Sequence, residues 1–259
     1  MTAMAAFTLR LGAALIVFSP SIAVVVLLLA KRAQLMILTI LAAFVWLVAV
    51  LGAALLWRML PEAARTAWPL VATIGVLVQE SGRMALVNLY RRTEKLLIAA
   101  SAAGEESATA TAVSGVAVSF PLNDWSSSLA AGVGFGTMHA IIMFGSVLAA
   151  SEGPATLYED SCVGVPMLLL YAVLALAFLM LDIMLMCILF HADRRGDRLM
   201  QGFAILLHLA ASFATLANQM EAGCAVSLPI VVIVLLVAVL ALMRTAPPVR
   251  TAELAGLQL

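Results

Sequence analysis

Six polar or ionisable residues occur within long apolar stretches of this sequence, where they could do chemistry or hold a ligand. They are Gln79, Glu80, Arg83, His139, Asp182 and His208. Carboxylates and imidazoles together can act as general bases and general acids. A catalytic interpretation makes Glu80 the general base on a water molecule, with His139 and His208 as ligands or acid groups. A structural interpretation pairs Glu80 with Arg83 and Asp182 with His208, so that the set fixes helix register or shapes a binding cavity.

Other protease and cofactor chemistries lack the residues that they require. A serine protease needs a nucleophilic Ser with a His partner, and no Gly-x-Ser-x-Gly segment occurs. An aspartyl protease needs two carboxylates that share a proton, whereas Asp182 is the one Asp within a long apolar stretch. Cys162, Cys187 and Cys224 lack zinc-site spacing, so we predict no metal and no cofactor. Cys162 and Cys224 are either a pair formed in an oxidising lumen or free buried thiols.

The elements that position these residues must cross a membrane. The chain has 259 residues, of which 64% are hydrophobic and 11% are charged, whereas a soluble domain is about 45 to 50% apolar. The composition therefore indicates an integral membrane protein. The formal net charge is zero and no long basic run occurs, so no nucleic-acid partner is expected.

The apolar stretches predict an all-α, polytopic membrane protein with seven transmembrane helices in one domain, residues 1–259. The expected spans are approximately 11–30, 35–56, 67–90, 129–150, 165–190, 199–218 and 225–243. The segment from about 96 to 123 is rich in Ala, Ser, Thr and Gly, and we expect it to be a mobile loop.

Basic residues predict the orientation. Placing the connections after spans one, three, five and seven on the cytosolic side collects ten of the Lys and Arg residues there and leaves three outside. The N-terminus is thus expected in the lumen or outside the cell, and the C-terminus in the cytosol. Counted from the cytosolic ends, Glu80 and His139 then lie about 15 Å deep, His208 about 13 Å, Asp182 about 12 Å and Arg83 about 10 Å, which predicts one polar layer.

Small residues recur at every fourth position of the fourth span. Gly132, Gly136 and Ala140 remove side chain from one stripe of this helix, so that another backbone can approach closely. His139 lies beside the stripe. This pattern favours a helix-packing seam.

Several stretches together resemble the anterior-pharynx-defective (Aph) subunit of γ-secretase, in order from about Phe7 to Met243. They are Phe18-Ser19-Pro20, residues 43–48, Gln79-Glu80 with Arg83, Gly132 with Gly136, the turn at 192–195, and His208 with Asn218. Two positions depart from the family pattern. Ala140 stands where the third glycine of the stripe belongs, and Asp182 stands where the first of two intramembrane histidines belongs.

This resemblance implies a non-catalytic scaffold of a membrane protease complex. The implied partners are a presenilin-like catalytic subunit, a nicastrin-like single-span glycoprotein and a presenilin-enhancer-like subunit. The implied location is the endoplasmic reticulum, the Golgi and downstream secretory, endosomal or plasma membranes. It also implies that Gly132 and Gly136 lie at an assembly seam, that His208 supports assembly, and that a presenilin segment enters a cavity lined by the polar layer.

Two alternatives remain at the level of sequence. Phe135-x-x-x-His139, His208-x-x-x-Ser212 and the pair Glu80 and Arg83 resemble, more distantly, glutamate-type membrane proteases that process CAAX proteins. The acidic motif differs, because Gln79 precedes Glu80 and Arg83 follows it by three residues. The other alternative is a small seven-span transporter or receptor that uses the polar layer as its site.

Overall fold

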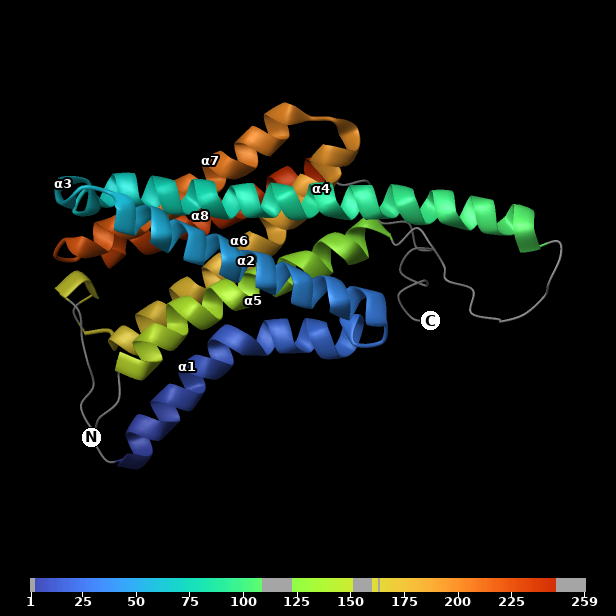
Figure 1. The fold of residues 1–259 in the computed structure, drawn as a ribbon. Coiled ribbons are helices and arrows are strands. Elements are labelled where there is room, and N and C mark those ends of the chain that lie inside the picture. The colour runs from blue at the N-terminus through green and yellow to red at the C-terminus, as the bar shows by residue number, and fades with distance from the viewer. Residues whose placement is uncertain (1–2, 109–122, 151–159, 163, 246–259) are drawn as a thin grey trace.

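The computed structural model describes residues 3–108, 123–150, 160–162 and 164–245 (Figure 1). Within these ranges the chain is helical and has no strand. The elements are α1 (Ala3–Val24), the π-helical turn η1 (Val25–Leu29), α2 (Ala33–Met59), α3 (Glu62–Arg65), α4 (Trp68–Ala108), α5 (Asp124–Ala150), the 3₁₀ turn η2 (Asp160–Cys162), α6 (Met167–Arg195), α7 (Arg198–Thr215), the 3₁₀ turn η3 (Leu216–Gln219) and α8 (Cys224–Thr245).

Seven helices of the described chain are long and apolar enough to cross a membrane. Their membrane-length segments are Phe7–Leu29, Ala33–Met59, Trp68–Ala100, Asp124–Ala149, Met167–Arg195, Arg198–Gln219 and Cys224–Thr245. The prediction of an all-α chain with seven such helices is therefore confirmed. Chains that span lipid as helices satisfy their backbone groups internally, which explains why the described segments contain no open strands.

The expected loop from 96 to 123 is wrong in its first part. Helix α4 continues without a break to Ala108, and residues 109–122 lie outside the described part of the chain. The segment after Leu96 is rich in alanine, which has the highest intrinsic helix propensity. A helix already nucleated inside the bundle extends easily through such residues. Figure 1 shows this extension projecting beyond the other helices.

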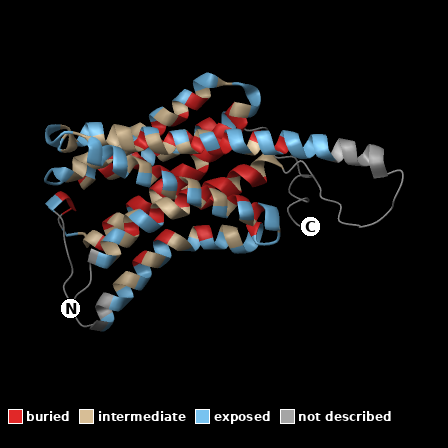
Figure 2. Ribbon diagram, viewed as in Figure 1, coloured by how far each residue is buried: buried red, intermediate tan, exposed pale blue. Residues whose placement is uncertain are grey.

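Helix α6 forms the centre of the bundle, because 72% of the residues in its most apolar segment are buried. It packs against α1, α5, α7 and α8, and α5 also packs against α2. In Figure 2 the buried residues gather along these central helices, while the outer surfaces are exposed. Those surfaces carry large apolar side chains, such as Phe44 on α2 and Leu236 on α8, as expected for helices that contact lipid.

Two local signals set the shape of the bundle. Pro20 lies inside α1, and the π-helical turn follows it; both disturb regular helix hydrogen bonding, and α1 bends in Figure 1. Gly196 ends α6 in the left-handed region with φ of 68°. The Asp197 carboxylate then accepts a hydrogen bond from the backbone N–H of Met200 at 3.0 Å and starts α7. This tight turn places α7 beside α6.

Candidate functional site

Five ionisable side chains from four helices meet inside the bundle, and we call them the charge cluster. Helix α4 supplies Glu80 and Arg83, α5 supplies His139, α6 supplies Asp182 and α7 supplies His208. Glu80, Arg83, Asp182 and His208 are at most 1% exposed. Ionisable groups this deep are costly unless they pair with one another.

Short contacts pair the basic side chains of the charge cluster with its two carboxylates. The Arg83 guanidinium donates from Nη2 to Asp182 Oδ1 at 2.5 Å and lies 3.4 Å from Glu80 Oε1. His139 Nδ1 contacts Asp182 Oδ2 at 2.8 Å, and His208 Nδ1 contacts Glu80 Oε1 at 2.5 Å. Each imidazole therefore has its own carboxylate, and Arg83 lies between the two carboxylates.

One of the two expected pairings is wrong. Glu80 and Arg83 do pair along α4, but Asp182 pairs with Arg83 and His139, and His208 pairs with Glu80. Depth along each span was accessible from the sequence, whereas the rotation of each helix about its axis was not. That rotation decides which carboxylate a given imidazole reaches.

Aromatic rings that the sequence pattern did not assign to the site surround the charge cluster. Trp46 of α2 stacks on His139 with ring centroids 5.0 Å apart and donates from Nε1 to Gln79 Oε1 at 3.2 Å. Phe178 contacts both imidazoles, with centroids 5.5 and 6.4 Å away. Arg83 lies over the Phe135 ring at 4.5 Å. The available signal was Trp46 in mid-span, far from the membrane interface where Trp is usual.

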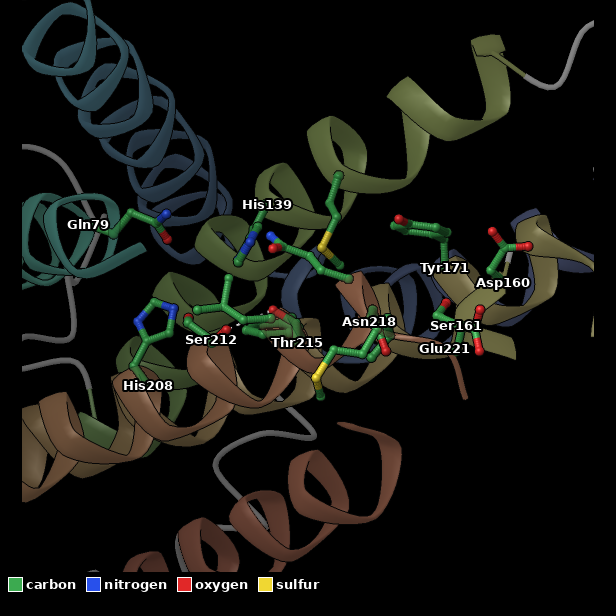
Figure 3. A pocket seen from close by; sticks show the side chains of 16 residues that line it. Gln79, His139, Asp160, Ser161, Tyr171, His208, Ser212, Thr215, Asn218 and Glu221 are labelled. Atoms are coloured by element: carbon green, nitrogen blue, oxygen red, sulfur yellow. Dashed lines mark hydrogen bonds between the residues drawn. The ribbon is translucent and has the colours of Figure 1, made fainter. Parts of the chain in front are cut away.

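A cavity of about 800 Å³ opens beside the charge cluster (Figure 3). Gln79, His139, Phe178 and His208 line its inner end. The remaining lining residues follow α5, α6 and α7 outward to η2 and η3; they are Met143, Asp160, Ser161, Tyr171, Leu174, Ser212, Thr215, Leu216, Asn218, Gln219, Met220 and Glu221. Glu80, Arg83 and Asp182 do not line the cavity, so the imidazoles stand between it and the carboxylates.

The contacts of Glu80 and of the two imidazoles bear on the general-base role considered for Glu80. A general base needs a carboxylate oxygen that reaches the reacting water. Glu80 Oε1 contacts His208 and Arg83, whereas Glu80 Oε2 is buried without a hydrogen-bond partner, and Glu80 does not line the cavity. The two imidazoles direct Nδ1 to different carboxylates instead of toward a common centre. Across the described residues, no three His, Cys, Asp or Glu side chains come together as metal ligands.

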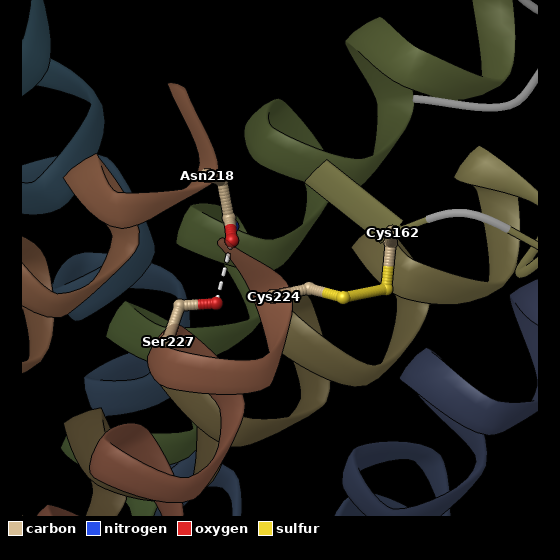
Figure 4. Close-up of a disulfide and its surroundings, with 4 residues drawn as sticks. All are labelled: Cys162, Asn218, Cys224 and Ser227. Carbon is tan, nitrogen blue, oxygen red and sulfur yellow. Dashed lines mark hydrogen bonds between the residues drawn. A yellow bond between two sulfur atoms is a disulfide. The ribbon is translucent and has the colours of Figure 1, made fainter. Parts of the chain in front are cut away.

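A disulfide lies at the outer end of the cavity (Figure 4). It joins Cys162 of η2 to Cys224 at the start of α8, with their Cα atoms 5.4 Å apart. Cys162 and Cys224 are therefore a disulfide pair and not free buried thiols. Cys187 is free and buried. Close by, Ser227 donates to Asn218 Oδ1 at 2.6 Å. These contacts tie η2, η3 and α8 together around the cavity opening.

The stripe of small residues packs against a helix of the same chain. A Cβ at Gly132 would lie 2.8 Å from the Cα of Ile183, and one at Gly136 would lie 2.8 Å from the carbonyl oxygen of Leu179. Both neighbours belong to α6. Ala140 is fully buried, with 0% exposure. The stripe thus brings α5 close to α6, next to the charge cluster.

A second ionic network, which was not predicted from the sequence, joins α4, α5 and α6 at the opposite end of the bundle from the disulfide. Arg91 and Arg194 both bond to the Asp124 carboxylate, at 2.7 Å each. Arg194 also reaches Glu94 at 2.8 Å, and Arg91 donates to the carbonyl oxygen of Phe190 at 2.8 Å. Asp124 begins α5, where a negative charge also favours the helix dipole.

In the described part of the chain, seven membrane-length helices around a buried charge cluster and a cavity define an integral multi-pass membrane protein. A family model described as Aph-1 protein matches residues 8–246. The chain therefore belongs to the Aph-1 family, which confirms the resemblance found in the sequence. A curated relative, the γ-secretase subunit APH1-like of Arabidopsis thaliana, is 30% identical over 227 residues, covering 86% of this chain and 87% of that protein.

Proposed function

We propose that this chain is a non-catalytic assembly subunit of a γ-secretase-like intramembrane protease complex, and that its cavity receives a segment of a presenilin-like catalytic subunit. The observation that carries the proposal is the cavity of about 800 Å³ that reaches the charge cluster inside the bundle. Family membership and the name of the Arabidopsis relative support the complex. The other proposed partners are a nicastrin-like glycoprotein and a presenilin-enhancer-like subunit.

The charge cluster supports a scaffold role through specificity. Hydrogen bonds between membrane helices contribute only about 0.6 kcal/mol on average, so such a cluster does more to define helix register than to raise total stability. Arg83, Asp182 and His139 link α4, α5 and α6, and His208 with Glu80 adds α7. Four helices held in one register give the cavity a fixed shape for a partner.

The small-residue stripe acts on assembly indirectly in this proposal. Gly132 and Gly136 contact α6 of the same chain, so they cannot offer that face to another subunit. They set the distance between α5 and α6, which supply His139 and Asp182 to the charge cluster and form one wall of the cavity. Larger residues would displace this wall.

The experiment is isolation of the tagged protein from its native membranes in a mild detergent, with co-purifying chains identified by mass spectrometry. Ser212 lines the cavity, so Ser212→Trp fills it. Ser146 is exposed on α5, and Ser146→Trp is the matched control. We expect the wild type and the control to recover a polytopic subunit with two intramembrane aspartates, together with a large single-span glycoprotein.

Ser212→Trp should lose the polytopic subunit while still inserting into the membrane. A wild-type protein recovered alone and monodisperse would refute the scaffold role. Full recovery of the polytopic subunit by Ser212→Trp would refute the cavity as its binding site. Proteolysis by the isolated protein that depends on Glu80 would instead support the enzyme alternative.

A further inference from the structure

Basic side chains gather around the second ionic network, and acidic residues neutralise only part of them. Within this network, Arg91 and Arg194 pair with Asp124 and Glu94. Four other basic side chains at the ends of α4, α6 and α7 are exposed and make no ion pair with a described residue; they are Arg92, Lys95, Arg195 and Arg198. This end of the bundle therefore presents a cationic surface.

A small cleft of about 30 Å³ between α4, α6 and α7 lies beside this surface. Asn88 of α4 and Arg198 of α7 line it together with Gln201, which is 8% exposed. Arg198 Nη1 donates to Gln201 Oε1 at 2.9 Å. This bond holds the guanidinium at the mouth of the cleft, and the other N–H groups of the guanidinium remain as donors.

The face of α4 beside the cleft is polar where a span normally contacts lipid. Asn88 is exposed within the membrane-length segment, and its side chain has no hydrogen-bond partner among the described residues. A polar group in this place is costly unless it meets a polar ligand. Arg92 and Lys95 follow Asn88 at i+4 and i+7, so the three share one face. At 1.5 Å per residue, Arg92 and Lys95 lie about 6 and 10 Å further outward.

The charge at these helix ends exceeds what a singly charged lipid neutralises. Six basic and four acidic side chains leave two positive charges; they are Arg91, Arg92, Lys95, Arg194, Arg195 and Arg198 against Glu94, Asp124, Asp193 and Asp197. Phosphatidylserine has a single net negative charge. A phosphoinositide has a phosphodiester next to its acyl chains and a phosphate monoester on the far side of the inositol ring. It therefore presents anionic groups at two depths, as the donors of α4 and α7 require.

We propose that the face formed by Asn88, Arg92, Lys95 and Arg198 binds the headgroup of a phosphoinositide. Arg198 and Asn88 donate to the phosphodiester at the mouth of the cleft, and Arg92 and Lys95 donate to the monoester phosphate further out. The cleft is too small for the headgroup itself. Leu77, which is 46% exposed and lies eleven residues before Asn88, continues the same face into the bilayer for the acyl chains.

This lipid site is independent of the proposed function. It lies at the opposite end of the bundle from the disulfide and the cavity opening. The predicted orientation places this end in the cytosol, and the cytosolic leaflet is the one rich in anionic lipids. Loss or recovery of the polytopic subunit in Ser212→Trp therefore says nothing about the lipid site, and the two proposals fail separately.

Native mass spectrometry of the full-length protein in detergent measures the binding. The probes are dioctanoyl phosphatidylinositol 4-phosphate, dioctanoyl phosphatidylserine and soluble inositol 1,4-bisphosphate. We expect the phosphoinositide to bind about tenfold more tightly than either of the other two, because it alone combines a monoester phosphate with acyl chains.

Lys95→Gln and Arg198→Gln should each weaken binding of the phosphoinositide about fivefold, because each removes one cation beside the headgroup. Asn88→Leu should weaken it about threefold through the lost hydrogen bond, although the net charge stays the same. Lys31→Gln is the matched control for Lys95→Gln. Lys31 is exposed at the same end of the bundle, in the turn before α2, and Figure 1 shows this turn on the opposite side of the bundle from α7.

Equal affinity for the phosphoinositide and phosphatidylserine would overturn the proposal. Binding of inositol 1,4-bisphosphate as tight as that of the lipid would also overturn it, because the site would then take a free phosphate. Equal losses in Lys95→Gln and Lys31→Gln would show general attraction to a basic surface and no built site. The comparison of probes uses the wild-type protein, so a variant that fails to fold does not prevent the test.

Discussion

Arg83 is the cation that both carboxylates of the charge cluster share. It is 0% exposed, and its Nη2 atom serves both Asp182 and Glu80. A buried cation of this kind is retained only if it is paired, and losing one partner of a buried pair costs more than the pair contributes. Arg83 is therefore the residue at which the charge balance of the bundle is most easily broken.

Arg83→Met should lower the stability of the solubilised protein by about 3 to 5 kcal/mol, because it leaves two buried carboxylates facing the imidazoles alone. The double variant Arg83→Met, Asp182→Asn should recover part of that loss, since it also removes one uncompensated charge. Thermal unfolding in detergent, followed by circular dichroism, measures both. Arg92→Met on the exposed surface of the same helix is the control and should change little. A double variant less stable than the single one would contradict this account.

At the same scale, the sequence predicted which residues would lie close together and one of the two pairings, Glu80 with Arg83, but not the carboxylate that each imidazole contacts. Gln79, Glu80, Arg83, His139, Asp182 and His208 stand out because ionisable and polar groups are costly in lipid. Trp46, Phe135 and Phe178 do not stand out, because aromatic residues in an apolar span cost nothing there. Their role depends on which face of each helix turns inward, and that is fixed by packing across the whole bundle.

Among the elements, the contact between α5 and α6 depends most on side-chain size. Gly132 and Gly136 allow the two backbones to approach, and Gly134 on another face of α5 would place a Cβ against the carbonyl oxygen of Thr39 in α2. Close backbone approach lets van der Waals contacts hold membrane helices together without a hydrophobic driving force. The sequence stripe predicted close packing, but only the fold identifies α6 as the neighbour.

Gly136→Leu should disrupt the fold of the bundle and the recovery of partners while leaving membrane insertion intact. Overpacking costs about 1 to 3 kcal/mol, and more where backbone must move, whereas insertion depends on hydrophobicity. Gly145→Leu is the matched control, because a Cβ there meets nothing within 4 Å. Resistance to alkaline extraction reports insertion, and co-purification reports assembly. Equal recovery of partners by Gly136→Leu and Gly145→Leu would rule out this role for the stripe.

The disulfide links η2 to α8 across a sequence separation of 62 residues. Replacing both Cys162 and Cys224 with Ala should lower stability by about 2 to 4 kcal/mol, because a cross-link restricts the unfolded chain. It should also weaken partner recovery, since η2 lines the cavity. Cys187→Ala controls for loss of a thiol. Thermal unfolding with and without reductant provides the measurement, and a reductant effect that persists in the double variant would exclude the disulfide as its source.

At the scale of the whole molecule, hydropathy was sufficient to predict seven helices, because about 20 apolar residues are needed to cross the hydrocarbon core. It could not predict where α4 ends, since Ala-rich helix and Ala-rich loop have the same composition. It also could not predict the second ionic network. Arg91 and Arg194 looked like ordinary interfacial cations, and only the packing of α4 against α6 brings both to Asp124.

We propose an orientation of the molecule in the membrane from the charges at its two ends. Lys31 and Arg32 lie at the turn between α1 and α2, at the same end as the α4 extension in Figure 1, and Arg244 closes α8. Excess basic charge marks the cytosolic side. The disulfide lies at the other end, and disulfides persist in oxidising compartments. Two independent physical arguments therefore favour a lumenal N-terminus and a cytosolic C-terminus.

An Asn-x-Thr acceptor tag placed at each end in turn tests this orientation. The N-terminal tag should be glycosylated in secretory membranes and the C-terminal tag should not, because the transferase acts in the lumen. In sealed vesicles with the lumen inside, an impermeant maleimide should label Cys162 and Cys224 only after reduction and permeabilisation. The double Ala variant gives the background. Glycosylation of the C-terminal tag would show that the bundle has the opposite orientation. The disulfide would then lie in the reducing cytosol, and the cavity would open toward a cytosolic partner segment.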